Sequence, residues 1–118
     1  MSFAPEVIMQ NNTEAVTFFE KDLMNLCQNI TLDSARVVFL SDYRCVLPLV
    51  NVTTAIIQSR SDKVVPSDVP VYMKQHLGIP TELKILSTDG HFPMLTVPSL
   101  LLDFLKEVLG VEKKQTKA

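Results

Sequence analysis

Two apolar stretches with a helical stretch between them constrain this chain more than any other feature. Residues 52–59 read Val-Thr-Thr-Ala-Ile-Ile-Gln-Ser, rich in β-branched side chains and free of glycine and proline. This pattern is typical of a strand buried on both faces, as in a parallel sheet. Residues 83–86 predict a second short strand, and the helix between the two begins at Pro66 and Ser67 and closes at Gly78. A strand, a crossover helix and a second strand predict an α/β fold with a parallel sheet.

Helical periodicity accounts for much of the rest of the chain. Apolar side chains at spacings of three and four residues predict helices over residues 13–26 and 31–39, and a short helix follows over residues 41–48. A last helix, residues 98–110, carries so many apolar side chains that we expect one of its faces to be covered. Because two parallel strands need further strands beside them and helices on both faces, the sequence is predicted to be part of a larger fold.

Composition argues against several classes of function. Hydrophobic residues make up 47% of the chain, enough for a core, and a formal net charge of −2 argues against a nucleic-acid binder, which needs a concentrated basic face. No stretch approaches the roughly 18 apolar residues of a membrane span, and no secretion signal is visible, so a soluble intracellular protein is expected. Cys27 and Cys45 are expected to be packed thiols rather than a disulfide. The sequence has no Cys/His cluster, phosphate-binding loop or dinucleotide motif, so we expect neither a metal nor a cofactor.

Two polar residues stand where the predicted strands end. Asp62 follows the first strand and His91 the second, and catalytic groups in open α/β sheets lie just past the carboxyl ends of strands. A carboxylate beside an imidazole holds the histidine tautomer and stabilises the imidazolium when it forms. In α/β-hydrolases the chain order is serine, acid, histidine, and Asp62 followed by His91 is the second half of that order. Asp89 is an alternative acid, although turn formation explains it better, because it lies in the same turn as His91.

The nucleophile that such a pair serves is missing from these residues. The only glycines are Gly78, Gly90 and Gly110, so there is no Gly-x-Ser-x-Gly motif and no glycine-rich oxyanion loop. No serine occupies a strand-to-helix elbow, and neither cysteine has the setting of a nucleophile. A general base without a hydroxyl group to activate does not hydrolyse esters, so the chain alone is predicted to be inactive.

Several motifs, taken together, are similar to those of a known family. The segment Ser-Arg-Ser-Asp-Lys-Val-Val-Pro (residues 59–66) and the segment Ser-Thr-Asp-Gly-His-Phe-Pro (residues 87–93) resemble the acid and histidine motifs of the plant strigolactone and karrikin receptor hydrolases, with matching spacing. Residues 39–47 resemble the F-x-S-D-x-R-x-x-L segment of that family, and residues 19–32 resemble its third and fourth lid helices. Residues 3–5 resemble its Phe-Ala-Pro stretch, so the resemblance is nearly continuous.

The resemblance implies the C-terminal part of an α/β-hydrolase fold with an incomplete sheet. Residues 1–47 are then a partial helical lid, residues 48–110 the C-terminal part of the α/β-hydrolase core, and residues 111–118 a disordered tail. It implies that Asp62 is the catalytic acid and His91 the catalytic base. It also implies that three aromatic side chains face the ligand pocket, although packing within the lid explains each of them equally well: Phe3, Phe19 and Phe39.

The resemblance further implies a function. Members of this family bind butenolide-type small molecules, hydrolyse them slowly with a serine–histidine–aspartate triad, and recruit F-box and repressor proteins in the cytoplasm and nucleus. This chain keeps the acid and the histidine but lacks the serine, so its own enzymatic activity stays open and an inactive fragment of a receptor hydrolase is expected. The alternatives are a truncated partner-binding isoform and a non-functional truncated gene product. Gln28 and Cys27 stand where the family has proline and arginine, so the lid helices are expected to join differently.

Overall fold

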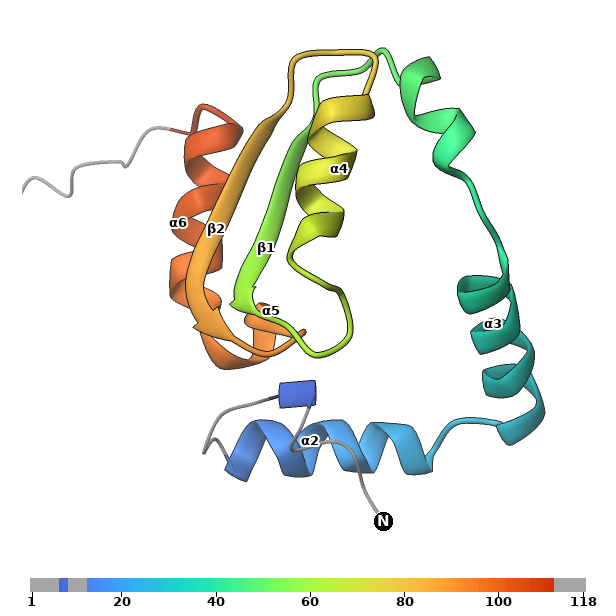
Figure 1. The fold of residues 1–118 in the computed structure, drawn as a ribbon. Coiled ribbons are helices and arrows are strands. Elements are labelled where there is room, and N and C mark those ends of the chain that lie inside the picture. The colour runs from blue at the N-terminus through green and yellow to red at the C-terminus, as the bar shows by residue number, and fades with distance from the viewer. Residues whose placement is uncertain (1–6, 9–12, 112–118) are drawn as a thin grey trace, which may run out of the picture.

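The computed structural model describes residues 7–8 and 13–111 of the chain (Figure 1). The order of its elements agrees with the sequence analysis, with the addition of one short helix, α5. The elements are α2 (Thr13–Met24), α3 (Gln28–Leu40), the 3-10 helix η1 (Arg44–Leu49), β1 (Ala55–Ser61), α4 (Asp68–His76), β2 (Glu82–Asp89), α5 (Pro93–Thr96) and α6 (Pro98–Val108). Among the described helices, none has the length and apolar character needed to cross a membrane.

β1 and β2 pair in parallel and make up the sheet of the described residues (Figure 1). The register is regular up to Ser59, which lies opposite Leu86, and then shifts so that Ser61 lies opposite Asp89. Between these two pairs β2 carries one residue more than β1, which is a β-bulge at the carboxyl end of the sheet. Both strands extend further toward this end than the apolar pattern predicts, because polar residues continue the ladder past the apolar run.

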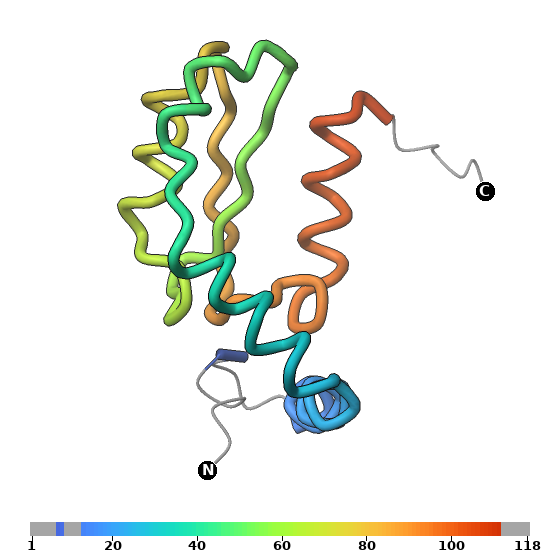
Figure 2. The backbone as a smooth tube through the Cα atoms, turned by 90° about the vertical axis from the view of Figure 1, so that its right-hand side faces the viewer, coloured from blue at the N-terminus to red at the C-terminus, as the bar shows by residue number. Residues whose placement is uncertain are grey.

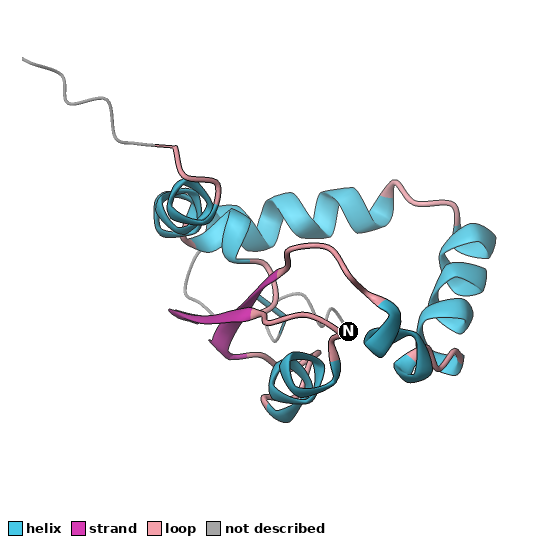
Figure 3. Cartoon of the chain, turned by 90° about the horizontal axis from the view of Figure 1, so that it is seen from above, coloured by secondary structure: helices cyan, strands magenta, loops and turns pink. Residues whose placement is uncertain are grey.

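Different helices cover the two faces of the sheet. α4 lies on one face and α6 on the other, as Figure 2 and Figure 3 show from the side and from above. This is the layering of an α/β protein, in which the crossover helix packs back onto a parallel sheet. Leu86 of β2 and Phe104 of α6 are buried, and the Lys84 ammonium group lies 5.4 Å from the centre of the Phe104 ring. The core between the sheet and α6 is therefore small and is closed at one side by a cation over an aromatic face.

α6 is covered less than its sequence predicts. Phe104 is its one buried side chain, whereas Leu102, Leu105 and Leu109 are exposed. The covered apolar side chains of this helix are therefore limited to Phe104, which is buried, and Leu101, which is half-buried. A helix buries its apolar stripe only where another layer reaches it, and a sheet of two strands is too narrow to reach the full stripe.

α2 runs beneath the carboxyl end of the sheet, and α3 stands apart from the sheet (Figure 1). The Cα radius of gyration is 16.9 Å, against about 13 Å for a compact domain of 100 residues. α3 contains no buried residue, and its apolar side chains Val37, Val38 and Phe39 are exposed. The helix forms as predicted but begins at Gln28, three residues before the predicted start, and no described segment covers its apolar stripe.

Both cysteines differ from the prediction. Cys27 is the N-cap residue of α3 and Cys45 lies in η1, and both are exposed free thiols. The prediction of packed thiols is wrong because neither α3 nor η1 contains a buried residue. A cysteine packs only where a neighbouring layer covers it, and that layer is not among the described segments.

The turn after α4 is pressed against η1. A Cβ atom on Gly78 would lie 2.2 Å from the Pro48 carbonyl oxygen, and the Gly78 amide donates a hydrogen bond to the Leu47 carbonyl oxygen at 3.2 Å. α4 itself ends at His76 with Leu77 as its C-cap residue. Gly78 was expected to end the helix. In the structure a glycine is required there because the backbones of Gly78 and η1 approach closely. This contact joins η1 to the α/β layers.

Candidate active site

Asp62 and His91 meet at the carboxyl end of the sheet. Asp62 directly follows β1, and His91 comes two residues after the end of β2. The His91 Nδ1 atom lies 2.8 Å from the Asp62 Oδ2 atom. Because the carboxyl ends of parallel strands share one edge of a sheet, the topology carries both residues to the same place. The structure therefore brings the candidate acid and the candidate base within hydrogen-bond distance.

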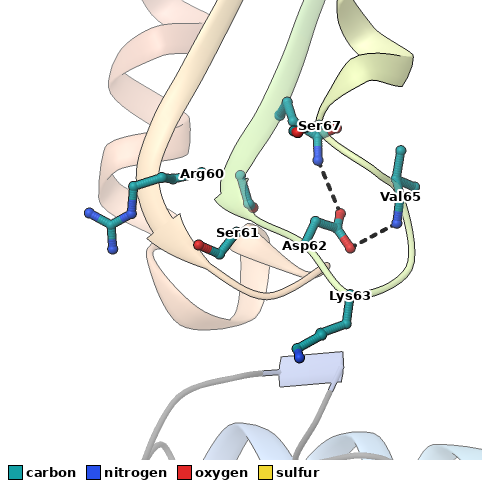
Figure 4. A pocket seen from close by; sticks show the side chains of 8 residues that line it. Arg60, Ser61, Asp62, Lys63, Val65 and Ser67 are labelled. Atoms are coloured by element: carbon teal, nitrogen blue, oxygen red, sulfur yellow. Dashed lines mark hydrogen bonds between the residues drawn. The ribbon is translucent and has the colours of Figure 1, made fainter.

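The Asp62 carboxylate is held on both oxygens. Oδ1 accepts hydrogen bonds from the backbone amides of Val64 at 2.8 Å and Val65 at 3.1 Å. Oδ2 accepts a hydrogen bond from Gln58 Nε2 at 3.3 Å in addition to the contact with His91. Figure 4 shows the loop after Asp62 curling around the carboxylate, which points toward Val65. Since the side chain is only 5% exposed, the carboxylate is shielded from water and fixed in one orientation.

Burial and hydrogen bonding act on this carboxylate in opposite directions. Burial by itself raises the pKa of Asp62, because it disfavours the charged form. The hydrogen bonds from His91 and from the amides of Val65 and Val64, with the charge of His91, outweigh burial, so the pKa of Asp62 lies below its ordinary value of 3.8. At neutral pH Asp62 is therefore an ionised acceptor, and the shared hydrogen belongs to His91 Nδ1. The neutral ring then carries its lone pair on Nε2.

His91 is positioned through its backbone as well as through its ring. The His91 amide donates a hydrogen bond to the Val7 carbonyl oxygen at 2.8 Å, and the ring meets the Phe92 ring edge-on with 5.0 Å between centroids. Its side chain is 32% exposed, in contrast to that of Asp62. A ring that is held at Nδ1 and open at Nε2 has the orientation that a general base requires.

Gly90 allows the histidine turn to form. Its φ angle is +95°, and a Cβ atom at this position would lie 2.0 Å from the Ile8 carbonyl oxygen. The Gly90 amide donates a hydrogen bond to the Ser61 carbonyl oxygen at 2.6 Å, which continues the link between the strands past the bulge. Only glycine satisfies both the positive φ angle and the close approach, so the residue before His91 is determined by its surroundings.

Asp89, the alternative acid, has a different partner. Its Oδ1 atom lies 2.9 Å from Arg60 Nη2. The hydrogen bond from Arg60 lowers the pKa of Asp89, burial raises it, and a hydrogen bond from Ser61 lowers it further. Asp89 is the last residue of β2 and lies opposite Ser61, so its assignment to the turn is wrong. Opposite charges at the ends of two neighbouring strands are compatible with this pair, but the sequence does not give the register that joins them.

An apolar cavity of about 370 Å³ lies next to the histidine turn. Its walls come from α2 and from the segment after His91, and they include Phe18, Phe19, Leu23, Phe92, Met94 and Leu95. The Phe19 ring lies 4.8 Å from the Phe92 ring between centroids, and Phe92 in turn contacts His91. Phe19 is therefore joined to the candidate site through one intervening ring.

The other two predicted aromatic residues are not brought to this cavity. Phe39 lies near the C-terminal end of α3, is 73% exposed, and does not line the cavity beside His91. Phe3 lies outside the described residues. Sequence reasoning missed Phe92, and the signal that could have identified it is its position directly after His91.

Other chemistry finds little support within the described part of the chain. No described serine or cysteine forms a hydrogen bond with the His91 ring, whose recorded side-chain partner is Asp62. No group of three or more histidine, cysteine, aspartate or glutamate side chains is arranged to hold a metal ion among these residues. A buried, ionised aspartate joined to a half-exposed histidine at the ends of parallel strands has the geometry that an acid and a general base require.

Comparison with known proteins identifies the family. No family model matches the chain. It is 41% identical over 107 residues to a strigolactone esterase of Arabidopsis thaliana, and 40% identical over 108 residues to a strigolactone esterase of Pisum sativum. It is also 38% identical over 104 residues to a karrikin insensitive 2 receptor of Petunia hybrida. The chain belongs to this plant family of strigolactone and karrikin receptor hydrolases.

The alignments cover most of this chain but less than half of each relative. The three alignments include 91%, 92% and 87% of this chain, but only 40%, 40% and 38% of the respective relatives. The chain therefore spans about two fifths of the length of the curated relatives that it matches.

Proposed function

We propose that Asp62 and His91 are the acid and the general base of a serine-type ester hydrolase, and that this chain alone is catalytically incompetent. The observation that carries the proposal is the 2.8 Å contact between His91 Nδ1 and a buried carboxylate whose two oxygens are already held by the surrounding loop. This arrangement directs the basic nitrogen outward. A nucleophile for that nitrogen is absent from the sequence, which contains no Gly-x-Ser-x-Gly motif.

The chemistry assigned to each residue follows from its protonation state. His91 Nε2 accepts the proton of a serine hydroxyl group while the serine oxygen attacks the ester carbonyl carbon. Asp62 stabilises the imidazolium that results, and His91 then returns the proton to the leaving oxygen. In this proposal the serine comes from the part of the family fold that precedes residue 1, the chain is the C-terminal part of an α/β-hydrolase, residues 1–47 are a partial lid and residues 48–110 are core.

The substrate class and the partners are proposed from the relatives. Their names mention strigolactone and karrikin, and we assign a butenolide-type small molecule to the apolar cavity beside Phe19 and Phe92. F-box and repressor proteins are the proposed protein partners, acting in the cytoplasm and the nucleus. Support for a small apolar ligand is the ring pair at 4.8 Å beside the histidine turn.

The test is a chimera in which this chain replaces the aligned 107 residues of the Arabidopsis strigolactone esterase. Hydrolysis of p-nitrophenyl acetate is measured for the chain alone, the chimera, and two chimera variants. We expect no turnover above buffer by the chain alone, turnover by the chimera, and loss of turnover in His91→Ala. His76→Ala is the matched control, because His76 is exposed and its contacts within the described residues are with Tyr72 of its own helix. A His91→Ala chimera that keeps full activity would falsify the assignment.

A second function is favoured by the apolar surface of α3. Ile30, Val37, Val38 and Phe39 are exposed on a helix without a buried residue, which suits a chain that binds another protein. In this alternative the chain competes with a full-length receptor for its protein partners. Addition of the purified chain should then reduce binding of the receptor to its F-box partner, whereas Val37→Asp should abolish the competition. A non-functional gene product predicts no competition by either protein.

A further inference from the structure

The bulge at the end of the sheet interrupts the regular ladder between the two strands that carry the acid and the base. Regular pairing stops at Ser59 opposite Leu86, and the next pair, Ser61 opposite Asp89, follows an extra residue in β2. Asp62 and His91 both lie beyond this point. A slip of one residue along either strand would reverse the direction of the side chains that follow and separate the pair. Past the bulge the Gly90 amide donates a backbone hydrogen bond to the Ser61 carbonyl oxygen, and side-chain contacts add to this link.

Arg60 and Asp89 supply such a link. Arg60 Nη2 lies 2.9 Å from Asp89 Oδ1, and the two residues are 29 positions apart, the same separation as Asp62 and His91. Asp89 also accepts a hydrogen bond from Ser61, so two successive side chains of β1 hold the last residue of β2. The charged pair thus lies at the bulge, and the candidate catalytic pair is the next cross-strand side-chain contact beyond it.

The link does not occupy the candidate site itself. Figure 4 shows the Arg60 side chain extending away from Asp62, on the other side of the end of β1. Arg60 also neutralises a carboxylate that lies only two residues from His91 in the sequence. Without Arg60, the negative charge of Asp89 would no longer be neutralised two residues along the chain from His91.

We propose that Arg60 and Asp89 form a positioning pair that holds Asp62 and His91 in their productive register. This inference rests on the proposed function, and it assigns to Arg60 and Asp89 no contact with substrate. The side chains are 60% and 35% exposed, and an ion pair that exposed contributes little to global stability. An effect of the Arg60–Asp89 ion pair on the orientation of the His91 ring can therefore be measured separately from its effect on the free energy of unfolding.

The protonation pattern of the histidine rings tests the proposal. In nitrogen-15-labelled chain above the histidine titration range, His91 should have its proton on Nδ1, because an ionised carboxylate can only accept. His76 Nδ1 lies 2.8 Å from the Tyr72 carbonyl oxygen, which also only accepts, so His76 is an internal reference in the same spectrum. We expect Arg60→Ala and Asp89→Asn to move the His91 proton toward Nε2, while His76 is unchanged.

Two further variants decide between positioning and general stability. The exchange Arg60→Asp with Asp89→Arg restores the opposite charges and should restore the His91 pattern that each single change loses. Arg36→Ala removes another exposed ion pair, between Arg36 Nη1 and Asp33 Oδ1 at 3.3 Å, and should leave His91 unchanged. In the active chimera, Arg60→Ala should lower kcat by about tenfold or more with KM unchanged, and Arg36→Ala should change neither.

Each outcome has a distinct meaning. If Arg60→Ala leaves His91 protonated on Nδ1 and kcat unchanged, the positioning role is overturned while the proposed function stands. If Arg60→Ala alters His76 and His91 together, the pair is a general stabilising contact and the positioning role is again overturned. If His91 of the unmodified chain is not protonated on Nδ1 at all, the acid–base assignment fails first and the positioning pair fails with it.

Discussion

The Nδ1 atom of His91 lies 2.8 Å from Oδ2 of Asp62, and one contact nearer the middle of the sheet Arg60 Nη2 lies 2.9 Å from Oδ1 of Asp89. Both contacts join the end of β1 to the end of β2, but they differ in their surroundings. Asp62 is buried and held by two backbone amides, whereas the Arg60 side chain is largely exposed. Two aspartates near one histidine are thus separated into different roles by their burial and by their partners.

Asp62→Asn and Asp89→Asn should have very different effects on hydrolysis by the chimera. Replacing Asp62 removes the ionised acceptor that fixes the His91 tautomer, and kcat should fall by roughly 10³- to 10⁴-fold. Replacing Asp89 removes only its attraction to Arg60, and kcat should fall by about tenfold. Steady-state kinetics with p-nitrophenyl acetate measures both. A larger loss from Asp89→Asn than from Asp62→Asn would show that the acid is assigned to the wrong aspartate.

Stability at acid pH should depend on Asp62. Its pKa in the folded protein lies below the ordinary value of 3.8, so its ionised form stabilises the fold above that pH. The stabilisation is lost as pH falls through the lowered pKa, because both states then bind the proton. The difference in unfolding free energy between the unmodified chain and Asp62→Asn should therefore shrink as pH drops from neutral toward about 2.

Asp42→Asn is the matched control for this titration. The hydrogen bonds from Arg44 hold the pKa of Asp42 at about 2, but Asp42 is exposed, whereas the Asp62 side chain is buried. Solvent screening makes such an exposed pair a weak contributor to stability. Urea denaturation at several pH values should show a small difference for Asp42→Asn. A pH-independent difference for Asp62→Asn would contradict the lowered pKa of Asp62.

Gly90→Ala should destabilise the chain much more than Gly110→Ala. Both glycines have positive φ angles, +95° and +63°, so alanine is strained at each position. At Gly110 a Cβ atom meets nothing within 4 Å, and strain alone should cost about 1 kcal/mol. At Gly90 the Cβ atom would lie 2.0 Å from the Ile8 carbonyl oxygen, so the cost should exceed about 3 kcal/mol. Equal midpoints of urea denaturation for the two variants would be incompatible with the described contact to Ile8.

Phe19→Ala should affect the chain where Phe39→Ala does not. Phe19 is partly buried and forms a ring pair with Phe92, so its truncation should reduce the free energy of unfolding by about 1–2 kcal/mol. Phe39 is 73% exposed, and its truncation should change the free energy of unfolding by less than about 0.5 kcal/mol. Thermal denaturation of both variants provides the comparison. A larger loss for Phe39→Ala would indicate that α3 packs against a surface outside the described contacts.

The main elements could be predicted from the sequence because their signals are local. The β-branched run that ends near Ser59 and the helix closed before Gly78 are each visible within a short window of residues. The candidate residues Asp62 and His91 could be singled out because each directly follows such an element. Their contact depends only on the parallel arrangement, which the strand–helix–strand order implies.

Features that depend on register or on covering layers could not be predicted in the same way. The extra residue of β2 and the contact between Arg60 and Asp89 follow from how two distant segments align, which no local pattern encodes. Periodicity likewise shows which side of a helix is apolar, but not whether another layer reaches it. That is why the sequence predicts a packed Cys27, whereas the structure exposes it.

The contact between the histidine turn and Val7–Ile8 has a consequence for the synthesis of the protein. The His91 amide donates to the Val7 carbonyl oxygen, and Gly90 is pressed against the Ile8 carbonyl oxygen. Val7 and Ile8 are synthesised before Gly90 and His91. They therefore cannot form this contact until Gly90 and His91 have been translated. A contact between residues so far apart in sequence forms late and slows folding. The nascent chain therefore carries these two apolar residues without this contact until Gly90 and His91 have been translated, and exposed apolar residues favour aggregation during that interval.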